Sequence, residues 1–238
     1  FVEALADPSE TWRGLSLTMP LKHVAAEAAT TLDRAARLSG AANTLVPGEE
    51  GPRGFNTDVA GLVAAIREQG IEDAGRARIL GAGATATSAL LALEALGARE
   101  IDIRARRPEQ ARPLVALGGQ LGLRVTAAPL DAPHPRSSPG ADPALTIATL
   151  PGDAEPAASV LEEIVVPGGL LVDVVYGTWP TPLARAWESA GGQAVSGLPM
   201  LLHQAVRQVR IFTSGDVDEP LPSESDVIAS MRRALVED

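Results

Sequence analysis

The sequence predicts an α/β protein made of two βαβ-type domains with mostly parallel sheets. The first observation behind this prediction is that short apolar runs alternate with helical patterns along the chain of 238 residues. The second is a glycine-rich turn that follows one predicted strand and opens a long apolar helix. The third is a change of pattern after an amphipathic helix that begins near residue 58.

The composition is that of a globular protein with an acidic balance. Hydrophobic residues make up 45% and charged residues 21% of a chain that is long enough to bury a sizeable core. The net charge of −10 excludes a basic face on the scale of the whole chain, so we expect no nucleic-acid partner. Cysteine is absent, which excludes disulfides and thiolate chemistry. The apolar stretches are too short to span a membrane, and we expect no membrane partner.

In the first part of the chain, strand and helix patterns alternate over short distances. Strands are predicted at residues 12–18, 41–46 and 54–56, and residues 47–52 form a turn by composition. Helices are predicted at residues 21–30, 33–38 and 58–68. Asp33 and Asp58 are the expected N-caps, and Gly70 would end the third helix.

The second part of the chain repeats the strand–helix unit more regularly. Strands are predicted at residues 78–80, 101–103, 124–127, 145–150, 170–175 and 194–195. Helices are predicted at residues 84–96, 108–121, 154–164, 182–190, 199–212 and 225–236. Residues 129–143 form a proline-rich loop without a helical pattern. We therefore predict a first domain of residues 1–57, completed by residues 198–238, and a second domain of residues 58–197.

The glycine-rich turn has the pattern G-x-G-x-x-A, in which Gly81, Gly83 and Ala84 follow a strand and open a helix. Glycines allow a tight turn and a close approach to a pyrophosphate, which the free N–H groups of the helix N-terminus then bind. This context favours a dinucleotide site over a simple tight turn.

The end of the next strand is basic. An NAD site would place an acidic residue about 20 residues after the glycines, but Asp102 falls inside the strand and not at its tip. The tip carries Arg104, Arg106 and Arg107. Guanidinium groups bind phosphate with two hydrogen bonds, so the tip favours NADP over NAD, the alternative being a solvated basic face.

Lysine, tyrosine and asparagine are so rare in this chain that each of these residues is a candidate for a functional role. Lys22 is the sole lysine among 20 basic residues, Tyr176 is the sole tyrosine, and Asn43 and Asn56 are the two asparagines. Either these positions resist substitution or they survive by chance. The histidines His23, His134 and His203 lack metal-ligand spacing, so we expect no metal site.

Taken together, these stretches resemble the shikimate dehydrogenase family. That family shows N-V-T-x-P-x-K, A-x-N-T, G-x-N-T-D-x-x-G, a glycine-rich turn, a basic strand tip and G-x-x-M-L-x-x-Q-A. The corresponding stretches here, in family order, are residues 15–22, 41–44, 54–61, 81–84, 104–107 and 197–205. They span nearly the whole chain, and the rare residues fall on motif positions.

The resemblance implies an N-terminal substrate domain and a Rossmann-type NADP domain, with the last helices returning to the first domain. It implies reversible reduction of 3-dehydroshikimate to shikimate, in the pathway to chorismate and the aromatic amino acids. A cytoplasmic monomer or homodimer is expected. By the same resemblance, Lys22 and Asp58 form the catalytic pair. The substrate would contact Thr18, Asn43, Asp58, Tyr176 and Gln204. The cofactor would contact Gly81, Gly83, Ala84, Arg104, Arg106, Arg107 and Gly197.

Two departures from the family pattern stand out. Ala84 replaces the second glycine of the family's G-G pair, so the phosphate would approach less closely. The family's substrate-binding S-x-S lies on a first strand upstream of Phe1, so we expect that strand to be missing and Phe1 to lie inside a later helix.

The chemistry of the residues agrees with the implied reaction. Ketone reduction needs a proton donor for the developing alkoxide, and a lysine oriented by a carboxylate can donate that proton and take it back. Arginine cannot, which explains a single lysine beside 19 arginines. His23 is a rival acid–base group that would point elsewhere. A quinate/shikimate dehydrogenase and a non-catalytic nucleotide-binding remnant are the alternative functions.

Overall fold

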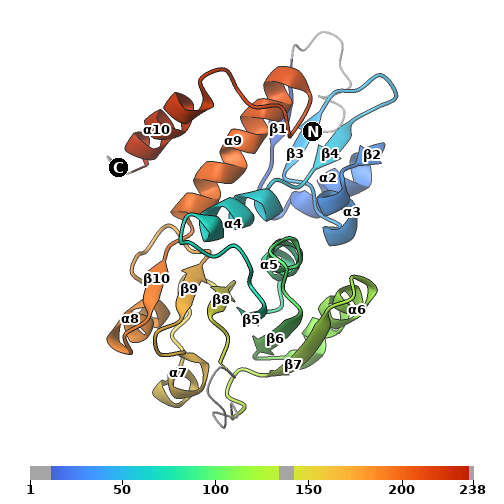
Figure 1. Ribbon diagram of the computed structural model, residues 1–238. Coiled ribbons are helices and arrows are strands. Elements are labelled where there is room, and N and C mark those ends of the chain that lie inside the picture. Colours follow the sequence, from blue (N-terminus) through green and yellow to red (C-terminus); the bar gives the residue numbers. More distant parts are fainter. Residues whose placement is uncertain (1–11, 134–141, 236–238) are drawn as a thin grey trace. The chain divides into compact units, whose positions relative to one another are not determined.

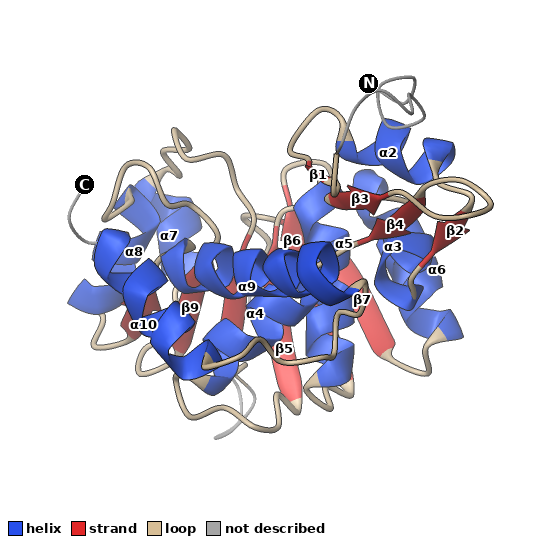
Figure 2. Ribbon diagram, turned by 90° about the horizontal axis from the view of Figure 1, so that it is seen from above, coloured by secondary structure: helices blue, strands red, loops and turns tan. Residues whose placement is uncertain are grey.

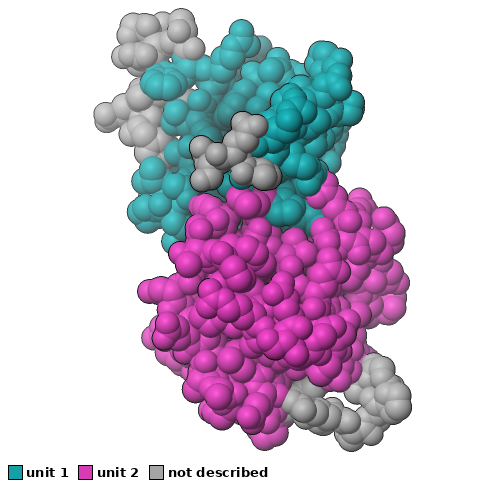
Figure 3. Space-filling view, turned by 90° about the vertical axis from the view of Figure 1, so that its left-hand side faces the viewer, with its two compact units in different colours: residues 1–65, 199–238 teal, residues 66–198 magenta. Residues whose placement is uncertain are grey.

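The computed structural model describes residues 12–133 and 142–235 of the chain. It divides into two compact units, residues 1–65 with 199–238 and residues 66–198 (Figure 3). Both units combine a sheet with helices, so the predicted α/β class is confirmed. The boundary between the units falls within one helix, between Ala65 and Ile66, whereas the sequence placed it between residues 57 and 58.

Unit 1 contains a four-stranded sheet with the order β1-β3-β4-β2. Figure 2 shows β3, β4 and β2 side by side. Its strands are β1 (Leu15–Ser16), β2 (Thr31–Leu32), β3 (Thr44–Val46) and β4 (Arg53–Phe55). Its helices are α2 (Lys22–Ala28), α3 (Arg34–Ser39), most of α4 (Asp58–Arg67) and α9 (Leu198–Ser214), and α10 (Glu224–Ala234).

The prediction of a mostly parallel sheet is wrong for unit 1. Strand β3 pairs antiparallel with both β1 and β4, and only β2 and β4 are parallel. The short turn over residues 47–52 explains the pairing of β3 with β4, because strands joined by a few residues pair antiparallel. Strand β2 was not predicted, since its two residues give no pattern that separates them from the helix before them.

Small side chains form the core of unit 1. Ala25, Ala36, Ala42 and Leu45 are fully buried between the helices and the sheet. The Asp33 carboxylate accepts a hydrogen bond of 2.6 Å from the backbone N–H of Ala36, which confirms the predicted N-cap of α3.

Unit 2 contains a six-stranded sheet with the order β10-β9-β8-β5-β6-β7, which can be followed across Figure 1. Every neighbouring pair of its strands is parallel, as predicted. The strands are β5 (Arg76–Leu80), β6 (Glu100–Ala105), β7 (Arg124–Pro129), β8 (Leu145–Ala148), β9 (Leu170–Asp173) and β10 (Gln193–Val195). The helices are α5 (Ala84–Ala95), α6 (Arg112–Gln120), α7 (Ala158–Ile164) and α8 (Pro182–Ser189).

Helix α5 and Trp187 show how unit 2 is packed. Seven residues of α5, on more than one side of the helix, are buried. This burial explains why the sequence of α5 is apolar on all sides. Trp187 of α8 is fully buried, and its indole N–H donates to the carbonyl of Gly169 at 2.8 Å. A buried tryptophan whose N–H has a partner contributes its full apolar area to the core.

Some predicted elements differ from the structure. The predicted helix at residues 108–121 is a 3-10 turn, Pro108–Ala111, followed by α6. The helix predicted from residue 154 begins only at Ala158, because Pro156 disfavours helical backbone just before it. The expected helix around Phe1, residues 134–141 of the proline-rich loop with His134, and residue 236 lie outside the described residues.

An ion pair holds helix α10 onto unit 1. The Arg210 Nε donates to Glu224 Oε2 at 2.6 Å, and Nη2 of the same side chain contacts Oε1. Glu224 Oε2 also accepts the backbone N–H of Leu221 at 3.0 Å. Helix α10 has no buried residue among those described, so this pair carries much of its attachment. The Arg210 hydrogen bond lowers the pKa of Glu224 below its ordinary value of 4.5.

We predict that Glu224→Gln lowers the free energy of unfolding by about 1 kcal/mol at neutral pH. Because the folded-state pKa of Glu224 is lowered, the stabilisation is complete above 4.5 and is lost as the pH falls through the folded-state pKa. Urea denaturation at neutral pH and at about pH 3 checks both parts. Asp226→Asn, an exposed acid in the same first turn, is the control. Equal losses for both variants would contradict the prediction.

Candidate active site

Lys22 and Asp58 meet in unit 1. Lys22 Nζ lies 2.6 Å from Asp58 Oδ2, and the two side chains are 18% and 8% exposed. The first begins α2 and the second begins α4, so both sit at helix starts beside the sheet. The structure thus brings together the predicted catalytic pair across 36 positions of sequence. A charged pair this short and this shielded from water orients the ammonium strongly.

The backbone around the pair is fixed by hydrogen bonds. The carbonyl of Lys22 accepts the N–H of Ala42 at 2.8 Å, which ties α2 to the segment before β3. The Asn56 side chain accepts the N–H of Asp58 at 3.1 Å. Helix α4 therefore starts at Asp58 itself. The sequence predicted that the Asp58 side chain caps this helix, but its carboxylate contacts Lys22 and Asn43 instead.

Asn43 is the centre of the network. Its side chain is buried, and its Nδ2 lies 2.8 Å from Thr57 Oγ1, 2.9 Å from Asp58 Oδ1 and 3.0 Å from Gln204 Oε1. An amide nitrogen has only two hydrogens, so these acceptors share them. Its Oδ1 accepts the N–H of Thr57 at 3.0 Å. Asp58 is therefore held at both oxygens, by Lys22 on one and Asn43 on the other.

Helix α9 delivers two glutamines to this network. Gln204 contacts Asn43 and Thr57, and Gln208 donates to the carbonyl of Asn43 and to Thr44 Oγ1, both at 3.0 Å. Ser16 in turn donates to Gln208 Oε1 at 3.0 Å. Sequence reasoning missed Thr57 and Gln208. The signals were present, since Thr57 lies inside a quoted motif and Gln208 follows Gln204 by one helical turn.

Gly61 sets how closely α4 and α9 pack. A Cβ atom on Gly61 would lie 2.8 Å from the carbonyl oxygen of Met200 and 2.9 Å from the Cβ of Gln204. Only glycine fits at this contact without moving a helix. The close packing is what brings Gln204 within reach of Asn43.

Thr18 and His23 lie near Lys22 in sequence but outside the network. Thr18 is exposed in the turn before α2, and its carbonyl accepts the N–H of Leu21 at 2.8 Å. Nδ1 of His23 lies 2.8 Å from the carbonyl of Gly40. The rival acid–base group is thus directed to the backbone near the end of α3 and not to Asp58.

The glycine-rich turn of unit 2 leaves the start of α5 open. Gly81 has φ of +107°, and a Cβ there would lie 2.5 Å from Thr149 Oγ1, so glycine is required twice over. Gly83 provides no side-chain cap for α5, and nothing lies within 4 Å of its added Cβ. Ala84 is the first residue of the helix. Uncapped N–H groups facing open space are what a pyrophosphate would bind.

The three arginines after the glycine turn separate into two kinds. Arg104 is 7% exposed, donates to Asp102 Oδ2 at 2.8 Å and to the carbonyl of Ala132 at 2.8 Å. Asp102 also accepts from the buried Arg78 at 3.1 Å. These interactions commit Arg104 to the sheet. Arg106 and Arg107 are exposed just beyond the end of β6, where they are accessible to a phosphate.

Tyr176 and Gly197 lie close to one another in the backbone of unit 2. Tyr176 is 56% exposed in the segment after β9. Gly197 donates its N–H to the carbonyl of Val175 at 2.8 Å, and its added Cβ would lie 2.3 Å from the carbonyl oxygen of Val174. Backbone packing by itself therefore requires glycine at position 197, and its cofactor role stays a prediction.

In residues 12–133 and 142–235, no group of three or more His, Cys, Asp or Glu side chains is placed to hold a metal ion. No helix in that same part of the chain is long and apolar enough to cross a membrane.

Several known proteins that are similar to this chain share one enzyme name, shikimate dehydrogenase. No protein-family model matches the chain. The NADP(+) shikimate dehydrogenase of Rubrobacter xylanophilus is 37% identical over 227 residues, covering 94% of this chain and 76% of the relative. The crystal structure of Mycobacterium tuberculosis shikimate dehydrogenase has a TM-score of 0.76 at 36% identity, covering 92% of this chain and 79% of the other. A Thermus thermophilus shikimate 5-dehydrogenase in complex with NADP(H) and shikimate has a TM-score of 0.74 at 30% identity, with coverages of 94% and 80%.

We predict that Gly61→Ala lowers the free energy of unfolding by about 1–3 kcal/mol, because the added methyl group overpacks the contact between α4 and α9. Gly119→Ala in α6 is the matched control, since nothing lies within 4 Å of its added Cβ. The control should be stabilised by roughly 0.5–1 kcal/mol, as expected for an exposed helical glycine. Urea denaturation measures both. Stabilisation of similar size in the two variants would show that α9 does not pack closely at Gly61.

Proposed function

Because the chain belongs to the shikimate dehydrogenase family, we propose that it catalyses the reversible NADP-dependent reduction of 3-dehydroshikimate to shikimate. The observation that carries the proposal is the Lys22–Asp58 pair, at 2.6 Å and largely shielded from water. Four of the six family motifs contribute a residue to this network, the fifth forms the glycine-rich turn, and the sixth, residues 104–107, ends strand β6.

The NADP molecule would supply the hydride. The residues of unit 2 fit that cofactor, since the open space at Gly83 and the uncapped start of α5 suit a pyrophosphate. Arg106 and Arg107 are the groups that would hold the ribose 2′-phosphate. Arg104 contributes indirectly, by its ion pair with Asp102 inside the sheet. The role assigned to Arg104 from the sequence therefore passes to its exposed neighbours.

Lys22 performs the proton transfer. As the substrate ketone is reduced, the ammonium stabilises the developing alkoxide and donates a proton to it, and the neutral amine takes that proton back in the reverse direction. Asp58 holds the ammonium through Oδ2. Asn43 holds the other oxygen of Asp58, which fixes the carboxylate plane and hence the direction of the Lys22 Nζ.

Substrate hydroxyl groups would bind to the polar side chains around this pair. Asn43 Nδ2 already donates a hydrogen bond to Gln204 Oε1, and a substrate hydroxyl group, which both donates and accepts, can take the place of either partner. Thr57 belongs to the same network. Thr18, exposed in the turn before α2, and Tyr176 of unit 2 are the remaining proposed substrate contacts.

The alternative functions are less well supported. A non-catalytic remnant has no use for a lysine and a carboxylate held this closely, and the similar proteins described above carry the NADP-dependent shikimate activity in their names. No observation in the structure favours the other alternative, a quinate/shikimate dehydrogenase. The cytoplasmic location, the monomeric or homodimeric state and the absence of nucleic-acid and membrane partners stay predictions.

We predict that Lys22→Arg lowers kcat for shikimate oxidation by about 10²- to 10⁴-fold while shikimate and NADP still bind. A guanidinium keeps the positive charge but, with a pKa above about 12, cannot exchange a proton at neutral pH. Steady-state kinetics with direct binding measurements check this. His23→Gln is the control, because that ring contacts the backbone of Gly40. Turnover of Lys22→Arg within about twofold of the parent would refute the proton-transfer role.

We also predict that Arg106→Ala raises KM for NADP by about tenfold or more and leaves KM for NAD nearly unchanged, because only NADP carries the 2′-phosphate. Arg185→Ala is the control, an exposed arginine of α8 that packs beside β10 and β9, far from β6 in the strand order. Parallel kinetics with both cofactors measure the effect. Equal losses with NADP and NAD would remove Arg106 from the 2′-phosphate site.

A further inference from the structure

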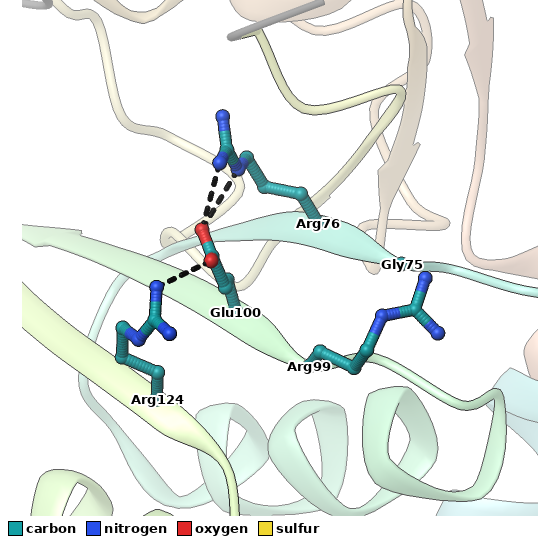
Figure 4. Close-up of a pocket in the computed structure, with 5 residues that line it drawn as sticks. All are labelled: Gly75, Arg76, Arg99, Glu100 and Arg124. Carbon is teal, nitrogen blue, oxygen red and sulfur yellow. Dashed lines mark hydrogen bonds and ion pairs between the residues drawn. The ribbon is translucent and has the colours of Figure 1, made fainter.

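A basic pocket lies at the amino ends of strands β5, β6 and β7 of unit 2 (Figure 4). It has a volume of about 370 Å³ and is lined by Gly75, Arg76, Arg99, Glu100 and Arg124. Three guanidinium groups and one carboxylate therefore face this pocket, in a chain whose net charge is −10. Such a local excess of positive charge on an acidic protein calls for a physical explanation.

The register of the sheet brings these charges together. Arg76 pairs with Glu100, and Glu100 pairs with Arg124, so the three side chains stand in one row on the same face of the sheet. Figure 4 shows Glu100 between the two arginines. One carboxylate oxygen accepts from Arg76 Nε at 3.0 Å, and the other lies 2.5 Å from Arg124 Nη1. Two guanidinium groups thus share the carboxylate of Glu100.

Arg99 adds a third guanidinium that Glu100 does not hold. Its side chain is 72% exposed, and its nearest carboxylate oxygen, Asp73 Oδ2, lies at 3.5 Å, which is long for an ion pair. Gly75 leaves room for it, since an added Cβ there would lie 3.4 Å from Arg99 Nη2. The backbone N–H groups of Arg99 and Glu100 are both bound to the carbonyl of Gly75. A ligand in the pocket would therefore be held by guanidinium groups.

The pocket is distinct from the glycine-rich turn. Arg76 begins β5, and Gly81 follows Leu80 at the other end of the same strand. Five strand residues at about 3.3 Å per residue separate the two positions by roughly 15 Å. An anion bound among the arginines at the amino end would therefore not be the pyrophosphate of a dinucleotide bound at the carboxyl end. Exposed cross-strand ion pairs stabilise a sheet little, so they do not account for the third arginine.

We propose that this pocket binds a small multivalent oxyanion of the phosphate type, between Arg99 and Arg124 and beside Arg76. Planar guanidinium groups bind phosphate oxygens in pairs, and phosphate oxyanions carry enough charge to attract groups already partly engaged by Glu100. The volume suits a phosphate or pyrophosphate group. The acidic balance of the whole chain disfavours a long polyanion. This inference is independent of the proposed catalytic function.

The test is isothermal titration calorimetry of the full chain with inorganic phosphate, pyrophosphate and adenosine 5′-monophosphate at constant ionic strength. We expect at least one to bind with a Kd of about a millimolar or tighter. The double variant Arg99→Gln/Arg124→Gln should weaken that binding by about tenfold or more. Both side chains are largely exposed, so the variant should fold. The two inorganic ions report free oxyanions, and the nucleotide reports a phosphate carried by a larger molecule.

A matched variant completes the design. Arg185→Gln removes an exposed arginine of α8. It should leave the affinity within about twofold of the parent, because Arg185 does not line the pocket. Unchanged affinity in the double variant, or an equal loss in Arg185→Gln, would overturn the proposal. So would failure of all three anions to bind the parent chain.

Discussion

The buried amide of Asn43 is the interaction on which the candidate site depends. It is 1% exposed and contacts Thr57, Asp58 and Gln204, while Gln208 binds the carbonyl of the same residue. One side chain thus joins the entry of β3, the start of α4 and the middle of α9. In a low-dielectric interior each of these polar groups is costly if left unpaired, so the elements hold one arrangement. That arrangement orients the carboxylate that orients the only lysine.

Much of this could be predicted from the sequence, where the signal was local. The turn at Gly81 and Gly83 and helix α5 came from a local pattern, whereas the pairing of Lys22 with Asp58, 36 positions apart, came from the resemblance to a family. The burial of Arg104 could not be predicted, because it depends on the carbonyl of Ala132, 28 residues later in the chain, in addition to Asp102 of the same strand. Strand β2 escaped prediction because two residues have no period. In the mixed sheet of unit 1, the turn over residues 47–52 makes β3 and β4 antiparallel, whereas β1 and β3 are distant in sequence and no local pattern gives their direction.

The unit 2 sheet uses arginine in two physical states. Arg78 is fully buried on the same face as the exposed row of Arg76, Glu100 and Arg124, one pleat further along. Burial lowers the pKa of the Arg78 guanidinium, and the charge of Asp102 acts in the opposite direction. Its Nη1 also donates to the carbonyl of Ile164 at 3.2 Å. A buried guanidinium with its hydrogen bonds made specifies strand register, whereas an exposed one remains accessible to solutes.

The chain path through the units has a consequence for synthesis. Unit 2 is continuous, residues 66–198, but unit 1 is assembled from residues before and after it. During translation the ribosome completes unit 2 first, while β3 and the start of α4 wait for the residues of α9 that carry Gln204 and Gln208. Domains that emerge whole fold as units, and contacts distant in sequence form late. The nascent protein would therefore fold unit 2, which carries the glycine-rich turn, before the hydrogen-bond network around Asn43 forms in unit 1. A chain whose synthesis stopped near residue 198 would contain a folded unit 2 and an incomplete unit 1.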